Sequence, residues 1–252
     1  MPYATNHGVR IHYEVEGEGP ALVLQHGGID CLDTWYELGY VDALKAAYQL
    51  ILIDARGHGA SDKPHEASAY GLQRTVEDIG VILDAQHLPK AHFWGYSMGG
   101  YIGFGLAKYL PERCASLIIG GQAPYARSFE GRRQQLRRGI EQGVEALVAS
   151  LETQYAAMWP GYIARLRTTD LVAQLALAQD RPSLEDVLPT MTMPCLLYAG
   201  DADANYPGVQ ACYKQIPNVT FVSLPGLNHL EGLRQIHVVL PHITKFLATV
   251  PA

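Results

Sequence analysis

One serine framed by glycines constrains this chain more than any other feature. Residues 91–101 read AHFWGYSMGGY, an apolar run that leads into Gly-x-Ser-x-Gly and then into apolar residues at helical spacing. This pattern predicts a strand that turns sharply into a helix, with Ser97 at the corner. The turn is so tight that side chains two positions before or after the serine would meet neighbouring backbone, and Gly95 and Gly99 carry none. A serine in an ordinary glycine-rich turn is the alternative, and the flanking strand and helix favour the sharp corner, here called the elbow.

Composition excludes several classes of protein. The chain has 252 residues, 48% of them hydrophobic and 17% charged, which is typical of a folded enzyme rather than a disordered segment. A formal net charge of −6 offers no basic surface for nucleic acid. The first residues lack a basic segment followed by an apolar core, and there is no run of 18 apolar residues. We therefore expect no secretory signal and no membrane span.

Cysteine and histidine spacing gives no sign of a metal or a cofactor. The four cysteines lie far apart, without a C-x-x-C pair, so we expect reduced thiols and a cytoplasmic protein. No set of His, Cys and carboxylate positions has metal-ligand spacing. The glycine pairs form neither a dinucleotide-binding loop nor a phosphate-binding loop. We expect an enzyme without metal or cofactor.

Apolar runs along the chain predict strands that alternate with helices. Such alternation predicts an α/β fold with a mostly parallel, doubly wound sheet, whose ligands bind outside the carboxyl ends of the strands. The expected strands span 9–15, 21–25, 50–54, 91–96, 115–120, 195–200 and 220–224, and the expected helices include 33–48 and 75–88. The elbow and the His26-Gly27-Gly28 loop both follow such strand ends.

The alternation stops between residues 123 and 189, where helical spacing continues without strands. We expect a core of residues 1–122 and 190–252, interrupted by a helical lid over the active site; ordinary covering helices are the alternative. Three side chains of this insertion are expected to shape the substrate pocket: Tyr125, Met158 and Trp159. The insertion also holds a group of arginines, interpreted as the solvated face of a helix, with a clamp for an anionic substrate as the alternative: Arg127, Arg132, Arg133, Arg137 and Arg138.

A serine hydroxyl is a poor nucleophile at neutral pH and needs a base, which in turn needs an acid to orient it. The order Ser97, Asp203, His229 supplies both partners, each just beyond a late strand. Asp203 is favoured over Asp201 because it lies three residues after the strand-ending Gly200. The other position for an acid, after the preceding strand, offers Gln122 and no carboxylate. Acyl transfer also needs hydrogen-bond donors for the oxyanion, and we expect the backbone N–H groups of Met98 and Gly28.

Taken together, these motifs resemble the α/β-hydrolase superfamily. The matching residues are His26-Gly27-Gly28, Asp54-x-Arg56-Gly57-His58-Gly59-x-Ser61-Asp62, Gly95-Tyr96-Ser97-Met98-Gly99-Gly100, Gly200-x-x-Asp203 and His229. The resemblance implies an eight-stranded sheet with strand two antiparallel, a cap between strands six and seven, and the triad assigned above. Asn228 departs from the common pattern, in which a glycine is frequent.

Within that superfamily, Ser97 argues against dehalogenases and epoxide hydrolases, which carry aspartate at the elbow. The leading hypothesis is a serine hydrolase of the carboxylesterase or lactonase type, which cleaves a small or medium ester or lactone through an acyl-enzyme. The alternatives on the same scaffold are a C–C bond hydrolase, a lyase, and a cofactor-free haloperoxidase or perhydrolase. A ligand receptor with slow turnover is a further alternative. The expected partner is a small molecule, and homo-oligomers stay open.

Overall fold

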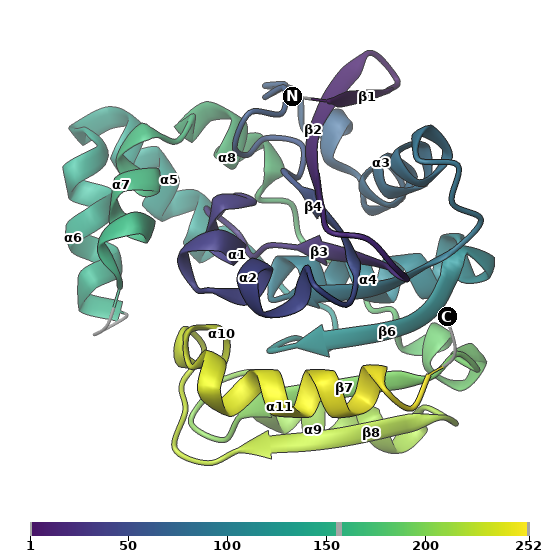
Figure 1. The fold of residues 1–252 in the computed structure, drawn as a ribbon. Helices are drawn as coiled ribbons and strands as arrows, with labels where there is room; N and C mark the ends of the chain where they lie inside the picture. The colour runs from purple at the N-terminus through teal and green to yellow at the C-terminus, as the bar shows by residue number, and fades with distance from the viewer. Residues whose placement is uncertain (1, 155–157, 251–252) are drawn as a thin grey trace.

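The computed structural model describes residues 2–154 and 158–250, and its centre is one eight-stranded sheet (Figure 1). The strands are β1 (Tyr3–Asn6), β2 (Val9–Glu16), β3 (Ala21–Gln25), β4 (Gln49–Ile53), β5 (Ala91–Tyr96), β6 (Cys114–Gly120), β7 (Cys195–Gly200) and β8 (Val219–Leu224). Their order is β1-β2-β4-β3-β5-β6-β7-β8, and β2 pairs antiparallel with both of its neighbours while the pairs from β4 to β8 are parallel. The predicted fold class and the antiparallel second strand are confirmed.

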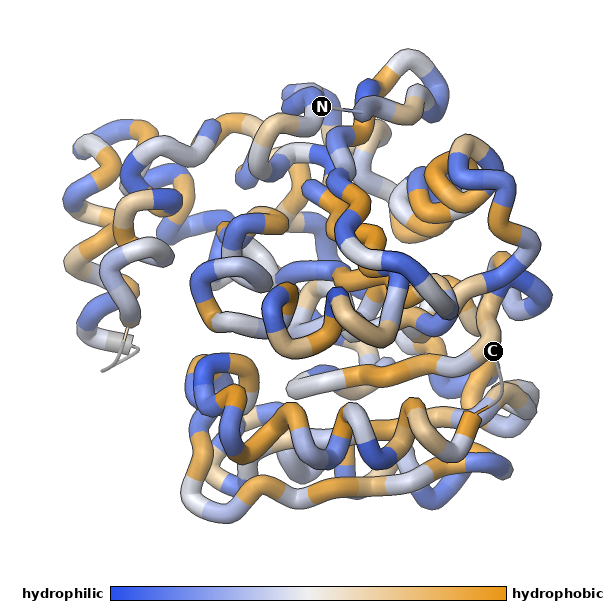
Figure 2. The backbone as a smooth tube through the Cα atoms, in the orientation of Figure 1, coloured by the Kyte–Doolittle hydropathy of each residue, from blue (hydrophilic) through white to orange (hydrophobic). Residues whose placement is uncertain are grey.

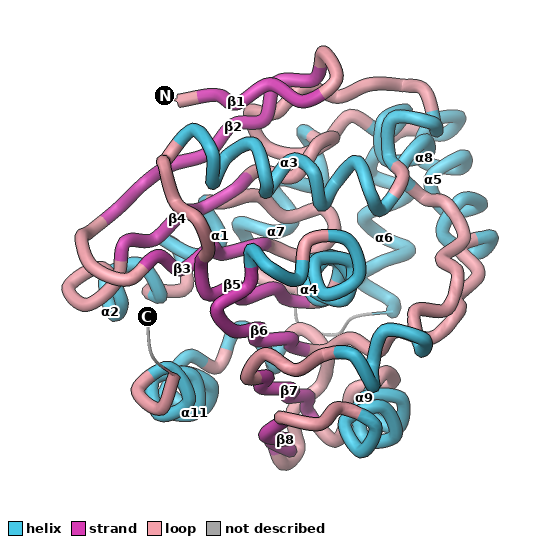
Figure 3. The backbone as a smooth tube through the Cα atoms, turned by 90° about the vertical axis from the view of Figure 1, so that its right-hand side faces the viewer, coloured by secondary structure: helices cyan, strands magenta, loops and turns pink. Residues whose placement is uncertain are grey.

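Helices cover both faces of this sheet, as Figure 3 shows end-on. One apolar layer packs under α3, α4 and α9, and the other packs under α1, α2 and α11. Every residue of β3, β5 and β7 is buried, because a strand covered on both faces needs apolar side chains in both directions. The helices alternate hydrophobic and hydrophilic segments along their length, most clearly in α11 (Figure 2). Their bounds are α1 (Asp33–Glu37), α2 (Tyr40–Leu44), α3 (Leu72–Ala85), α4 (Met98–Tyr109), α9 (Tyr206–Cys212), α10 (Glu231–Arg234) and α11 (Ile236–Leu247).

The prediction of a single helix over residues 33–48 was wrong. Two short helices replace it, separated at Gly39, whose φ of 82° lies in the left-handed region. Five residues along a continuous helix would turn Trp35 and Tyr40 about 140° apart. The break instead places both rings edge-on to Trp94 of the central strand, each with its centroid 5.0 Å from that of the indole. Packing of these aromatic side chains prevails over helix continuity.

The insertion between β6 and β7 forms a separate helical group beside the sheet (Figure 1). Its helices are α5 (Glu130–Gln142), α6 (Val144–Gln154), α7 (Pro160–Thr168) and α8 (Leu171–Leu177). They bury an apolar cluster of their own. The expected lid, residues 123–189, includes residues 155–157, which lie outside the described residues. None of the described helices is both long and apolar enough to cross a lipid bilayer.

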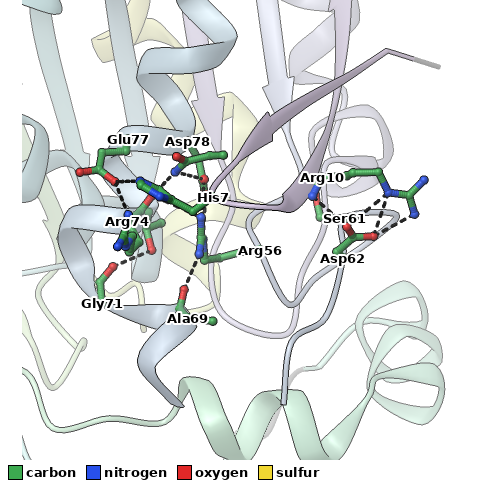
Figure 4. A network of polar contacts seen from close by, with 12 residues as sticks. His7, Arg10, Arg56, Ser61, Asp62, Ala69, Gly71, Arg74, Glu77 and Asp78 are labelled. Carbon is green, nitrogen blue, oxygen red and sulfur yellow. Dashed lines mark hydrogen bonds and ion pairs between the residues drawn. The ribbon is translucent and has the colours of Figure 1, made fainter. Parts of the chain in front are cut away.

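The loop after β4 is fastened by a buried ion pair (Figure 4). Arg56 donates from Nε and Nη2 to the two carboxylate oxygens of Asp78 on α3, at 2.7 and 2.6 Å. Both side chains are at most 3% exposed, and Arg56 also donates to the carbonyl of Ala69. At the other end of the loop, Asp62 accepts hydrogen bonds from the exposed Arg10. The D-x-R-G-H-G-x-S-D motif therefore ties β4 to α3 and β2.

Replacing Arg56 with Gln should destabilise the fold strongly. The change leaves the Asp78 carboxylate buried without its cation, which costs about 3–5 kcal/mol when a buried pair loses one partner. Urea denaturation followed by circular dichroism measures the loss. Arg10→Gln is the matched control, and because that pair is exposed its effect should be much smaller. Equal losses of unfolding free energy in the two variants would show that the Arg56–Asp78 pair does not stabilise the loop more than the Arg10–Asp62 pair does.

Candidate active site

Ser97 occupies a strained backbone at the corner between β5 and α4. Its φ of 54° and ψ of −108° are unfavourable for a residue with a side chain. A Cβ built at Gly95 would lie 2.2 Å from the carbonyl oxygen of Gly99. One built at Gly99 would lie 2.2 Å from the carbonyl oxygen of Gln25. Both glycines are therefore required by close backbone contact, as the sequence predicts for the elbow.

The structure brings Ser97, His229 and Asp203 together in a hydrogen-bonded line. His229 Nε2 lies 2.9 Å from Ser97 Oγ, and His229 Nδ1 lies 2.7 Å from Asp203 Oδ2. A carboxylate only accepts hydrogen bonds, so Nδ1 carries the proton and Nε2 is left to accept one from the serine. The Asp203 side chain is 1% exposed and that of His229 is 20% exposed. Such a line can move a proton from the serine to the imidazole.

The two candidate carboxylates after β7 lie in different environments. Asp203 is buried, and its Oδ1 accepts the N–H of Asn205 at 2.8 Å while Oδ2 meets His229. Asp201 is exposed and accepts the N–H of Gly226 at 2.7 Å, which closes the loop after β8. Asp203 alone of the two contacts the imidazole.

Two residues that sequence reasoning did not assign to the site hold the His229 loop. The hydroxyl of Tyr96 donates to the backbone carbonyl of His229, and the two rings lie 5.4 Å apart. The Asn228 side chain accepts the N–H groups of Leu230 and Glu231 at 3.0 and 3.1 Å. This amide holds the turn that leads into the short helix α10, which accounts for asparagine where the family often has glycine. The position of Tyr96, inside the Gly-x-Ser-x-Gly motif, is the signal that could have found it.

The His26-Gly27-Gly28 loop adjoins the serine. His26 Nε2 accepts the N–H of Ala55 at 3.1 Å, so its Nδ1 carries the proton and donates to the carbonyl of Gly27 at 2.7 Å. Burial lowers the pKa of His26, which keeps the ring neutral in this role. A Cβ at Gly27 would lie 3.6 Å from that of Ser97. Gly28 and Met98, the expected oxyanion donors, both line the cavity in front of the serine.

That cavity has a volume of about 850 Å³ and is walled by the core on one side and the insertion on the other. Its size falls within the range of small-molecule sites, roughly 300–1,000 Å³. Ser97, His229 and Trp159 line it. The structure does not bring the other two expected pocket residues to this wall. Tyr125 packs on the core beside Gly208, and Met158 packs into the apolar cluster of the insertion, because each finds apolar cover there.

The residues directly after Gly28 join the His26-Gly27-Gly28 loop to the insertion. Ile29, whose φ is 71°, is 5% exposed and belongs to the apolar cluster of the insertion. Asp30 accepts from Arg165 of α7 at 3.1 Å, and the same guanidinium donates to Glu37 at 2.7 Å. Burial raises the pKa of Asp30 to about 6, while Arg165 opposes that rise by favouring the charged carboxylate. This contact was not apparent from sequence spacing, since 135 positions separate Asp30 from Arg165.

Apart from Arg165 and Arg167, the arginines of the insertion form two groups. Arg133 pairs with Glu130 and Asp180 at 2.9 and 2.8 Å, and Arg137 pairs with Glu130 at 3.4 Å. Arg137 and Arg138 are exposed and belong to the solvated surface that the sequence predicts, whereas the Arg133 side chain is only 18% exposed. A second group lines the cavity instead: Arg127, Arg132 and Arg181.

Metal-ligating side chains do not gather in the described ranges. Across residues 2–154 and 158–250, no three His, Cys, Asp or Glu residues are grouped so that they could hold a metal ion. The four cysteines are buried free thiols.

Comparison with known proteins gives a consistent set of relatives. Residues 20–161 match the family described as "alpha/beta hydrolase fold". The chain is 27% identical to a Bacillus subtilis (strain 168) protein, provisionally named a 2-succinyl-6-hydroxy-2,4-cyclohexadiene-1-carboxylate synthase, over 95% of this chain and 96% of that one. It is 30% identical to 3-oxoadipate enol-lactonase 1 of Acinetobacter baylyi over 65% of this chain and 64% of that one. The solved enol-lactonase of Burkholderia xenovorans LB400 superposes with a TM-score of 0.86 at 25% identity, over 98% of this chain and all of that one.

Replacing Arg165 with Gln should loosen the insertion from the His26-Gly27-Gly28 loop. The change leaves the buried Asp30 without its cation and costs about 3 kcal/mol of unfolding free energy. Chemical denaturation measures the loss, and hydrogen exchange should rise in α7. Arg167→Gln, which breaks only the exposed pair with Glu145, is the matched control and should leave exchange in α7 near its native level. Unchanged exchange in Arg165→Gln would show that this contact does not hold the insertion.

Proposed function

Since this chain belongs to the α/β-hydrolase family, we propose that it is a serine hydrolase that cleaves a small or medium carboxylic ester or lactone. The observation that carries the proposal is the line from Ser97 through His229 to Asp203, with its two hydrogen bonds of 2.9 and 2.7 Å, at the wall of the cavity. The enol-lactonases among its relatives support an ester or lactone as the bond that is cleaved.

In the proposed mechanism, Ser97 Oγ attacks the carbonyl carbon of the substrate as its proton passes to His229 Nε2. Asp203 stabilises the imidazolium that forms. The N–H groups of Met98 and Gly28 donate to the oxyanion of the tetrahedral intermediate. Collapse of that intermediate expels the alkoxide, which takes the proton from His229 and leaves Ser97 acylated. Water, activated by the same imidazole, then attacks the acyl-enzyme and releases the acid.

A lyase on the same scaffold is the second candidate. The observation in its favour is the Bacillus subtilis relative, whose name is that of a synthase and which matches nearly the whole chain. In that alternative, His229 takes the proton of Ser97, the serine oxygen removes a proton from a substrate carbon, and the electron pair forms a double bond as a leaving group departs, so that no acyl bond forms. Covalent labelling of the serine together with product analysis separates the two reactions.

The proposal predicts that a fluorophosphonate probe adds one label, on the peptide that carries Ser97. Ser97→Ala should lose both the label and the hydrolysis of 4-nitrophenyl esters. Ser223→Ala removes an exposed hydroxyl on β8. This variant is the control, and its Ser97 should be labelled fully. Intact-mass and peptide mass spectrometry measure the label, and a panel of aryl esters of increasing acyl length and of lactones measures the activity. Labelling at another serine with Ser97 unmodified would overturn the assignment.

The two carboxylates after β7 should behave differently when each becomes an amide. Asp203→Asn favours the wrong tautomer of His229 and should lower kcat by about 10⁴-fold, as the equivalent change does in serine proteases. Asp201→Asn keeps an acceptor for the N–H of Gly226 and should retain kcat within about tenfold. Steady-state kinetics on one aryl ester measures both. The opposite pattern would mean that Asp201 orients the base, and two mild losses would mean that another group does.

A further inference from the structure

Two arginines of the insertion are held side by side at the cavity. The backbones of Arg127 and Arg181 exchange two hydrogen bonds of 2.9 Å in an isolated antiparallel bridge. Residues paired in this way point their side chains to the same face, with Cα atoms about 5.5 Å apart. Both residues line the cavity that contains Ser97. Two positive charges are therefore fixed close together on one wall.

Within the described ranges, no carboxylate pairs with either of these two guanidinium groups. The neighbouring Arg133, in contrast, takes both Asp180 and Glu130 as partners. The cavity is lined by two carboxylates, Asp30 and Asp203, and they are engaged by Arg165 and His229. The bridge thus adds positive charge to the cavity without a protein counter-ion.

Aromatic rings hold the Arg181 guanidinium in place. It lies 4.4 Å from the ring centroid of Tyr101 and 4.8 Å from that of Phe129. Burial lowers the pKa of Arg181 to about 10, with Arg127 contributing, so the group still carries its charge at neutral pH. An arginine ordered by rings rather than by an ion pair keeps its N–H donors available to a ligand.

The position of Tyr101 relates this charge to the reacting serine. Tyr101 lies one turn beyond Ser97 on α4, where its N–H donates to the carbonyl of Ser97 at 3.1 Å. The four residues from Ser97 to Tyr101 advance about 6 Å along the helix. Arg181 and Ser97 also line the same cavity, so an anion at Arg181 and a carbonyl at Ser97 can belong to the same small molecule.

We propose that Arg181 and Arg127 bind a free carboxylate of the substrate, so that the preferred substrates are esters or lactones that carry a second, ionised carboxyl group. This inference rests on the proposed function and narrows its substrate class. Guanidinium groups recognise a carboxylate through paired, charge-assisted hydrogen bonds. Binding of the carboxylate also relieves the repulsion between the two arginines.

The test compares 4-nitrophenyl half-esters of glutarate, adipate and pimelate with the same compounds methylated on the free carboxyl. Wild-type protein should show a kcat/KM at least about tenfold higher for an anionic ester than for its neutral partner. A factor of this size is expected from one charge-assisted hydrogen bond. Arg181→Met and the more exposed Arg127→Met should each lower this ratio, and Arg181→Lys should restore part of it. Arg133→Met, which removes an arginine outside the cavity that is paired with two carboxylates, is the matched control and should keep the ratio. A ratio near one in wild type, or no change in either cavity variant, overturns the proposal.

Binding without turnover separates this inference from the proposed function. Calorimetric titration of Ser97→Ala with glutarate should show binding that Arg181→Met abolishes in the same background. No binding of glutarate to Ser97→Ala overturns the carboxylate site, even if neutral esters are hydrolysed and the serine hydrolase assignment stands. If no ester is hydrolysed, glutarate binding that depends on Arg181 still supports the site. Inorganic phosphate shares the recognition chemistry, and tighter binding of phosphate than of glutarate would reject a carboxylate as the ligand.

Discussion

Backbone packed directly on backbone at the elbow sets the geometry on which the rest of the site depends. Gly99 lies against the carbonyl of Gln25 at the end of β3, and the N–H of Ser97 donates to the carbonyl of Gly120 at the end of β6. The serine is thus positioned by three adjacent strand ends. The backbone of Ser97 keeps its unfavourable dihedral angles because these contacts fix the residues on both sides of it.

His229 and Asp203 are positioned by a similar contact beyond the last two strands, at the same edge of the sheet. A Cβ at Gly200 would lie 1.9 Å from the carbonyl oxygen of Leu227, so the loops after β7 and β8 touch through their backbones. This contact brings Asp203 and His229 within hydrogen-bond distance although 26 positions separate them. The geometry of the proposed catalytic residues comes from glycine positions as much as from the side chains themselves.

Sequence reasoning succeeded where residue type and strand end coincide. Ser97, Asp203 and His229 each follow a strand of a parallel sheet, so their meeting at one edge follows from topology, and the structure brings them together there. It failed where the outcome depends on tertiary packing, as in the helix broken at Gly39 to seat two rings on Trp94. Arg181 could not be singled out, because only a bridge across 54 positions joins it to Arg127. Tyr125 and Met158 were expected at the pocket because they belong to the insertion, and spacing gives no direction for a side chain in an irregular segment.

The packing of Ile29 limits how the insertion can be exchanged between related proteins. In the sequence it belongs to the core, but its side chain packs into the apolar cluster of the insertion. Asp30 and Glu37 are also core residues, and both bind Arg165 of the insertion. The insertion is therefore not an exchangeable module bounded by residues 123 and 189. A chimaera that takes its insertion from a relative has to inherit positions 29, 30 and 37 from the same parent, or the strained loop beside the serine loses its support. The shape of the cavity and the geometry of the His26-Gly27-Gly28 loop are thus inherited together.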